Sequence, residues 1–183
     1  MIGESFEKGV LMVLGGAKSG KSRYALDLCN LLGENRIFIA TAQALDDEMC
    51  QRIERHKAER GNSWKTVEES LNIVEVIQDY DNECSVILLD CITLWISNLL
   101  MKYQEDDRCI KDEVEKLVGC LKKISGRVVL VSNDVGMGIV PDNPLSRRYR
   151  DLLGLTNQRI AWASDMVVML VAGLPLILKQ PEV

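Results

Sequence analysis

Short runs of apolar residues alternate along this chain with longer segments in which apolar and polar residues mix. The short runs are typical of strands that are buried on both faces, and the mixed segments have helical periodicity. The pattern predicts strands at 10–14, 36–42, 63–69, 85–90, 127–133, 165–173 and 174–179. It predicts helices from the end of the segment 15–22 to about Leu32 and at 46–60, 92–103, 109–124 and 145–163.

The order of these elements predicts an α/β fold. Alternating strands and helices indicate a mostly parallel sheet with helices on both faces. The last two strands are joined so tightly at 173–175 that they should form a hairpin, which makes the final edge strand antiparallel. With 183 residues, we expect one domain that spans residues 1–183.

Composition excludes several classes of function. The formal net charge of −5 argues against a general binder of nucleic acid or anionic membranes. No apolar run approaches the roughly 20 residues that a membrane span needs, and the N-terminal segment has no secretory pattern. The six cysteines form no CxxC pair, so we expect reduced thiols and a cytoplasmic protein.

The segment between the first predicted strand and helix has the chemistry of a phosphate-binding loop. It fits GxxxxGK[ST] and consists of Gly15, Gly16, Ala17, Lys18, Ser19, Gly20, Lys21 and Ser22. The glycines allow backbone N–H groups to surround phosphate oxygens at the start of a helix. Lys21 would reach the outer phosphates, and the Ser22 hydroxyl would bind Mg²⁺. The alternative, a glycine-rich turn, explains neither the lysine nor the correctly placed strand and helix.

Asp90 ends the apolar strand "VILLD" and is the candidate for the second Mg²⁺-associated carboxylate. An aspartate at this place can also cap a helix, so its assignment depends on the phosphate-binding loop. The two features together predict that the protein binds a nucleoside triphosphate. They leave open a kinase, a switch GTPase and a motor-like ATPase.

The chain has one histidine, His56, within the predicted helix 46–60. Asp46 can cap this helix and Gly61 can end it. At about 100° per residue, one face carries Leu45, Met49, Ile53, His56 and Arg60, with Arg52 at its border.

This placement allows two interpretations of the histidine. His56 packs at the end of an apolar stripe, or it is a nucleophile that faces a phosphate site. Nearby guanidinium groups would favour the neutral, nucleophilic imidazole and would also hold phosphates. The helical projection therefore makes Arg52 and Arg60 candidate nucleotide contacts.

Five segments give the chain a resemblance to a known family. They are "GGAKSGKSRYA", "IATAQALDDEMCQRIERHKAERGNSWKTVEE", "LLDCITLWISNLL", "VVLVSNDVGMGIVPDNPLSRRYRDLLGLTNQRIA" and "LVAGLPLILK". In this order they resemble the bifunctional adenosylcobinamide kinase / adenosylcobinamide-phosphate guanylyltransferase family of cobalamin biosynthesis.

The resemblance implies two reactions on a small corrinoid substrate. ATP or GTP would first phosphorylate adenosylcobinamide, and GMP from GTP would then pass through a phosphoramidate on His56 to give adenosylcobinamide-GDP and pyrophosphate. The resemblance also implies a RecA-like P-loop fold and a homotrimer. Residues 133–143 follow a strand at the expected carboxyl edge of the sheet, where ligands bind in such folds, and we expect them to form part of the substrate pocket.

Two alternatives stay open at this point. One is a P-loop kinase without guanylylation, in which His56 is structural. The other is a nucleotide-dependent binding module or GTPase switch, although "SNDV" at 132–135 lacks the lysine of the guanine-reading NKxD motif. Covalent labelling by GTP would distinguish both from the bifunctional enzyme.

Overall fold

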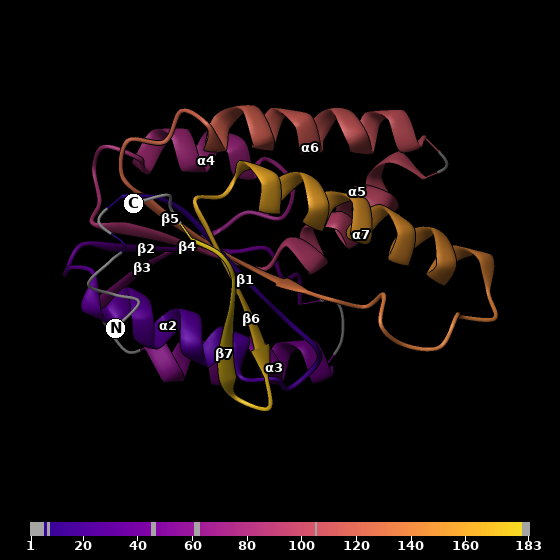
Figure 1. The fold of residues 1–183 in the computed structure, drawn as a ribbon, viewed down its shortest axis with the longest axis horizontal. Helices are drawn as coiled ribbons and strands as arrows, with labels where there is room; N and C mark the ends of the chain where they lie inside the picture. Colours follow the sequence, from indigo (N-terminus) through magenta and orange to yellow (C-terminus); the bar gives the residue numbers. More distant parts are fainter. Residues whose placement is uncertain (1–5, 7, 45–46, 61–62, 105, 181–183) are drawn as a thin grey trace.

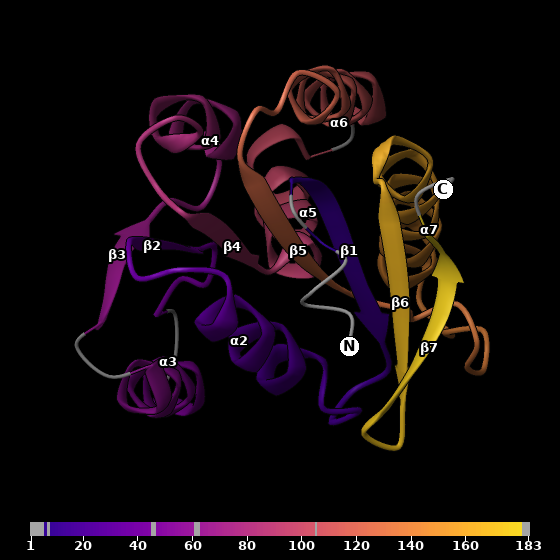
Figure 2. The same cartoon turned by 60° about the vertical axis from the view of Figure 1, so that its left-hand side comes forward.

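The computed structural model describes residues 6, 8–44, 47–60, 63–104 and 106–180, without the side chains of residues 48, 52, 55, 56 and 59. All the strands in this part of the chain belong to one sheet. The strands are β1 (Gly9–Gly15), β2 (Arg36–Ala40), β3 (Trp64–Glu68), β4 (Val86–Asp90), β5 (Arg127–Asn133), β6 (Met166–Val171) and β7 (Leu174–Lys179). Their order is β3-β2-β4-β5-β1-β6-β7, and Figures 1 and 2 show the twist of this sheet.

Every neighbouring pair of strands is parallel except the last. β6 and β7 pair antiparallel as the C-terminal edge hairpin, whereas β1 lies between β5 and β6 with both neighbours parallel to it. The predicted fold class is therefore confirmed, including the antiparallel edge strand. None of the helices in the described part of the chain is long and apolar enough to cross a lipid bilayer.

Helices cover both faces of the sheet (Figure 2). α2 (Lys21–Leu31) and α3 (Asp47–Arg60) lie on one face. The other face is covered by α4 (Ile73–Tyr80), α5 (Ile92–Tyr103), α6 (Asp107–Leu121) and α7 (Pro144–Ala163). Two apolar clusters follow from this arrangement, since alternate residues of a strand point to opposite faces. In β1, Leu11 and Val13 pack on the α2 face, and Val10 and Met12 pack on the other.

The predicted elements are confirmed within a few residues, with one omission. α4 is absent from the prediction, although its apolar residues recur with helical spacing. β2 ends at Ala40, two residues earlier than predicted, and β6 is also shorter than its predicted range. The predicted cap Asp46 and stop Gly61 of α3 lie outside the described residues.

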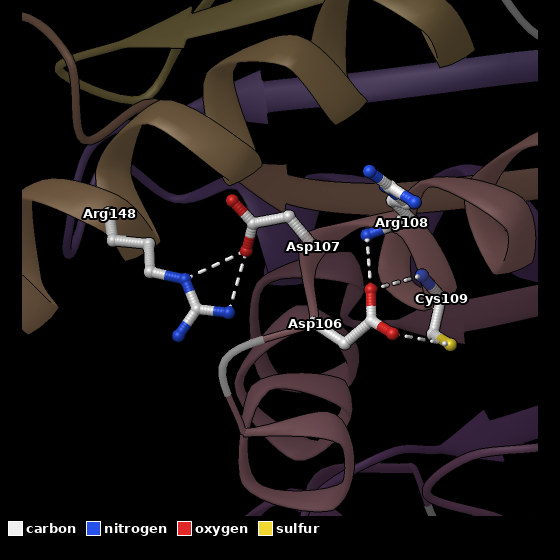
Figure 3. Close-up of polar contacts among 5 residues, drawn as sticks. All are labelled: Asp106, Asp107, Arg108, Cys109 and Arg148. Carbon is white, nitrogen blue, oxygen red and sulfur yellow. Dashed lines mark hydrogen bonds and ion pairs between the residues drawn. The ribbon is translucent and has the colours of Figure 1, made fainter.

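α6 begins at Asp107, two residues before its predicted start, because Asp106 caps it. The Asp106 carboxylate accepts hydrogen bonds from the backbone N–H groups of Arg108 and Cys109, which stabilises the helix start. Figure 3 shows this cap beside a second contact, in which Arg148 of α7 donates to the Asp107 carboxylate over 2.7 Å. This ion pair ties the start of α6 to α7.

Candidate active site

The phosphate-binding loop connects β1 to α2, as the sequence predicts. Its backbone needs residues without a β-carbon: at Gly15 a β-carbon would clash with the Ser19 hydroxyl and lie 2.9 Å from the Leu170 carbonyl oxygen. Gly20, immediately before α2, has a φ of 93°, a left-handed conformation that favours glycine. Lys18 also has a positive φ, 56°. The loop therefore has the tight curvature that phosphate binding requires.

Lys21 and the C-terminal hairpin both help to hold the loop in place. Lys21 is 9% exposed, and its Nζ donates a hydrogen bond to the Gly16 carbonyl oxygen over 3.1 Å. The Gly173 N–H, in the turn between β6 and β7, donates to the Ser19 carbonyl oxygen over 3.0 Å. The C-terminal hairpin thus supports the phosphate-binding loop from the side.

The carboxyl ends of three parallel strands bring candidate residues together on the α2 face. Val13, Val131 and Leu88 all belong to the apolar cluster on that face. Two residues further along their strands are Gly15, Asn133 and Asp90, so these share the face. Gly15 pairs in register with Asn133, and Asp90 pairs with Val131 on the far side of β5. The predicted carboxylate is therefore two strands from the phosphate-binding loop.

Two polar atoms at this edge are buried without a hydrogen-bond partner among the described residues, the Ser19 Oγ and the Asn133 Oδ1. The backbone around Asn133 is firmly held: its N–H donates to Thr93 Oγ1 over 2.8 Å, and its carbonyl oxygen accepts from Asn157 Nδ2 over 2.9 Å. Buried polar groups are normally paired with protein or with ordered water, so these two atoms are free to accept a hydrogen bond from water or from a ligand.

The donor set near the loop fits Mg²⁺. Ser22 lies in the first turn of α2, and Asp90 ends β4; both provide oxygen ligands, which Mg²⁺ prefers. Among the described residues, no group of three or more His, Cys, Asp or Glu side chains could hold a metal. A cation here would therefore depend on these oxygens and on substrate phosphates, as is usual for Mg²⁺ in nucleotide sites.

A cavity of about 390 Å³ lies apart from the phosphate-binding loop, between α3 and the carboxyl ends of β2 and β3. This volume is within the range of small-molecule sites. Lys57 lines it and pairs with Glu68 over 3.0 Å, and the hydrogen bond to Glu68 raises the pKa of Lys57. The cavity also contains Glu69 and Ser70, which the sequence prediction missed because two strands and a helix bring these residues together in space.

α3 carries the remaining predicted residues, and their outcomes differ. The side chains of His56 and Arg52 lie outside the described residues, so their roles stay predictions. Arg60 is 9% exposed, and its guanidinium lies 3.7 Å from the centre of the Phe38 ring. Phe38 is on β2, three strands from β1, a separation of roughly 14 Å at the usual strand spacing. The structure thus does not bring Arg60 to the phosphate-binding loop, and its phosphate contact stays a prediction.

This fold and this loop define a RecA-like P-loop nucleotide-binding protein. A solved structure supports the fold: the flagellar accessory protein FlaH from Methanocaldococcus jannaschii superposes with a TM-score of 0.55 at 14% identity, over 96% of this chain and 80% of that one.

The chain belongs to the cobinamide kinase / cobinamide phosphate guanyltransferase family, whose model matches residues 11–178. The bifunctional adenosylcobalamin biosynthesis protein CobP of Pseudomonas aeruginosa is 44% identical over 168 residues, which cover 92% of this chain and 96% of the relative. The bifunctional adenosylcobalamin biosynthesis protein CobU of Escherichia coli is 39% identical over 178 residues, which cover 90% of this chain and 97% of the relative. The family resemblance seen in the sequence is confirmed.

Proposed function

We propose that this protein phosphorylates adenosylcobinamide with ATP or GTP and then transfers GMP from GTP to the new phosphate, with adenosylcobinamide-GDP and pyrophosphate as products. Membership of the family supports both reactions. The structural observation that carries the proposal is the loop at 15–22, which leads into α2. It contains a buried lysine, glycines at positions that favour glycine, and a Ser19 hydroxyl without a hydrogen-bond partner among the described residues.

In the kinase step, the corrinoid hydroxyl oxygen bonds to the γ-phosphorus while the bond to the β,γ-bridging oxygen breaks. The nucleoside diphosphate leaves, and the hydroxyl proton passes to water. Lys21 and the loop N–H groups stabilise the charge on the transferred group. To do so, the Lys21 ammonium exchanges the Gly16 carbonyl oxygen for phosphate oxygens. The Ser19 hydroxyl and the Asn133 amide are the polar groups that the bound phosphate and acceptor complete. Ser22 and Asp90 would hold Mg²⁺, which would supply positive charge against the phosphates.

In the guanylyl step, we propose His56 as the nucleophile. Its neutral imidazole attacks the α-phosphorus of GTP, pyrophosphate leaves, and the corrinoid phosphate then displaces the imidazole. The covalent intermediate divides one displacement into two, each with a good leaving group. α3 places His56 one helical turn before Arg60, and Arg52 and Arg60 are our candidate phosphate contacts for this step.

The direct test follows the corrinoid. Purified protein with Mg²⁺, ATP and adenosylcobinamide should give the corrinoid phosphate, and addition of GTP should convert this compound into adenosylcobinamide-GDP, both detected by liquid chromatography with mass spectrometry. A phosphate that GTP never converts would indicate a kinase alone. An unchanged corrinoid under conditions where nucleotide binds would contradict the proposal.

We further propose that residues 1–183 form one domain that assembles as a homotrimer in the cytoplasm. The edge strand β7 supports self-association, since it exposes apolar side chains that water solvates poorly: Leu174, Leu176, Ile177 and Leu178. The six free cysteines suit a reducing compartment. Light scattering of the purified protein would give the number of subunits.

A further inference from the structure

A separate cavity of about 290 Å³ adjoins the phosphate-binding loop on the opposite face of the sheet. It lies between the segment that follows β5 and the middle of α7, with Leu14, Asp134, Val135, Gly136, Gly154, Asn157, Gln158 and Ala161 around it. The Asp134 N–H donates to the Gly15 carbonyl oxygen over 3.2 Å. One wall of this cavity is therefore bonded directly to the first residue of the phosphate-binding loop.

Gly154 is an unusual residue for its position. It lies in the interior of α7, where glycine is less favourable than alanine. Elsewhere in the chain, packing explains a glycine: at Gly126 a β-carbon would lie 2.6 Å from the Asp81 carbonyl oxygen. At Gly154, however, a β-carbon would meet nothing within 4 Å among the described residues. The fold does not require this glycine, and its missing side chain leaves open space against α7 for a ligand.

The polar wall of the cavity consists of the Asp134 carboxylate and the amides of Asn157 and Gln158. Asn157 uses both ends of its amide, accepting from Ser132 Oγ over 2.7 Å and donating to the Asn133 carbonyl oxygen. The Asp134 carboxylate accepts from the Gly136 N–H over 2.8 Å and has further acceptor sites. Gln158 is exposed at the rim. Such a wall suits a neutral ligand that has both donors and acceptors, as a primary carboxamide does.

Three exposed apolar residues follow the polar wall along the chain. Met137, Ile139 and Val140 are 76%, 96% and 57% exposed. They follow Gly136 in the segment after β5, whose residues 134–136 line the cavity. A ligand that combines carboxamide groups with a broad apolar body matches both parts of this site.

A cobinamide has this chemistry, because primary carboxamides surround its corrin ring and its aminopropanol arm ends in the hydroxyl that a kinase would phosphorylate. We propose that this cavity is the corrinoid subsite: a carboxamide arm enters beside Gly154, and the ring lies over Met137, Ile139 and Val140. The bond between Asp134 and Gly15 then sets the distance from the ring to the phosphate-binding loop. This inference rests on the proposed function.

Gly119 provides a matched control. It also lies in a helix interior, in α6, and a β-carbon there would also meet nothing within 4 Å among the described residues. Helix propensity therefore predicts that Gly154→Ala and Gly119→Ala both raise the melting temperature. If the corrinoid binds beside Gly154, only Gly154→Ala should also weaken corrinoid binding.

The experiment measures the kinase reaction with adenosylcobinamide and ATP for wild type, Gly154→Leu, Gln158→Leu and Gly119→Leu. We expect Gly154→Leu to raise the KM for the corrinoid about tenfold or more, a loss of the size that follows from blocking one pocket contact. Gln158→Leu, an exposed change that leaves the core intact, should raise it several-fold. The KM for ATP and the labelling of the protein by α-labelled GTP should stay at wild-type values, and Gly119→Leu should match wild type throughout.

Three different outcomes would contradict either the proposed function or the corrinoid subsite, and the measurements distinguish them from one another. A wild-type protein that binds ATP but does not phosphorylate the corrinoid removes the proposed function itself. If the wild type is active and both Gly154→Leu and Gln158→Leu keep the wild-type KM for the corrinoid, only the subsite assignment is wrong. If light scattering shows a smaller assembly for Gly154→Leu than for wild type, and the rates of both reactions fall together, the cavity is a contact between subunits.

Discussion

Replacing Asn133 by leucine should make the protein more stable and a poorer kinase. The side chain shares the α2 face with the phosphate-binding loop, and its Oδ1 is buried without a partner among the described residues. Leucine has the same branching at Cγ and no polar atom, and the bonds that hold this residue use its backbone N–H and carbonyl oxygen, which the substitution keeps.

The magnitude follows from the unpaired oxygen. A buried acceptor without a partner costs about 1–3 kcal/mol, and an apolar group of similar shape removes that cost. Allowing for imperfect packing of leucine, we expect a gain of about 1 kcal/mol in the free energy of unfolding. For a chain of this size, such a gain raises the melting temperature by about 2–4 °C.

The assay combines chemical denaturation with kinase kinetics. Asn133→Leu should lower kcat of the kinase reaction by about tenfold to a thousandfold, the range seen when one group that contacts the reacting phosphate is removed. Asn82→Leu, a change at an exposed asparagine, is the control. If Asn133→Leu lowers the stability and lowers kcat only in proportion to the folded fraction, the residue is structural and the reasoning is refuted.

Two further predictions concern single side chains. Lys21→Ala should lower the kcat/KM of the kinase reaction by about 100-fold or more, because Lys21 is the lysine expected to reach the outer phosphates. Steady-state kinase kinetics check this, with the exposed Lys8→Ala as control. Burial raises the pKa of Cys84 to about 11, so at pH 8 its thiol stays protonated and should react with iodoacetamide far more slowly than exposed Cys50. Mass mapping that finds Cys84 modified first would contradict this environment.

The sequence predicts most of the elements because their patterns are local. The strand at 86–90 is apolar throughout, as expected when helices cover both faces. α4 was missed although Ile73 and Ile77 form a buried helical stripe, because the helix has only eight residues. Short apolar segments between acidic residues give a weak signal of this kind.

The arrangement of the site depended on information that no local pattern contains. Helical projection places Arg60 on the inward face of its helix, and the structure agrees. Whether that face meets a phosphate or the Phe38 ring depends on the strand order, which places β2 three strands from β1. The placement of residues 15–22 between β1 and α2 was predictable, since the motif is contained in one contiguous segment.

The measurement that tests the central claim most directly is covalent labelling by GTP. Protein incubated with Mg²⁺ and GTP labelled at the α- or the γ-phosphate is denatured, and the acid and alkali stability of the bound label is compared for wild type and His56→Ala. The account predicts an acid-labile, alkali-stable label from α-labelled GTP alone, absent from the variant. A folded wild-type protein that binds GTP and takes up no label, or a label that persists in His56→Ala, would contradict it.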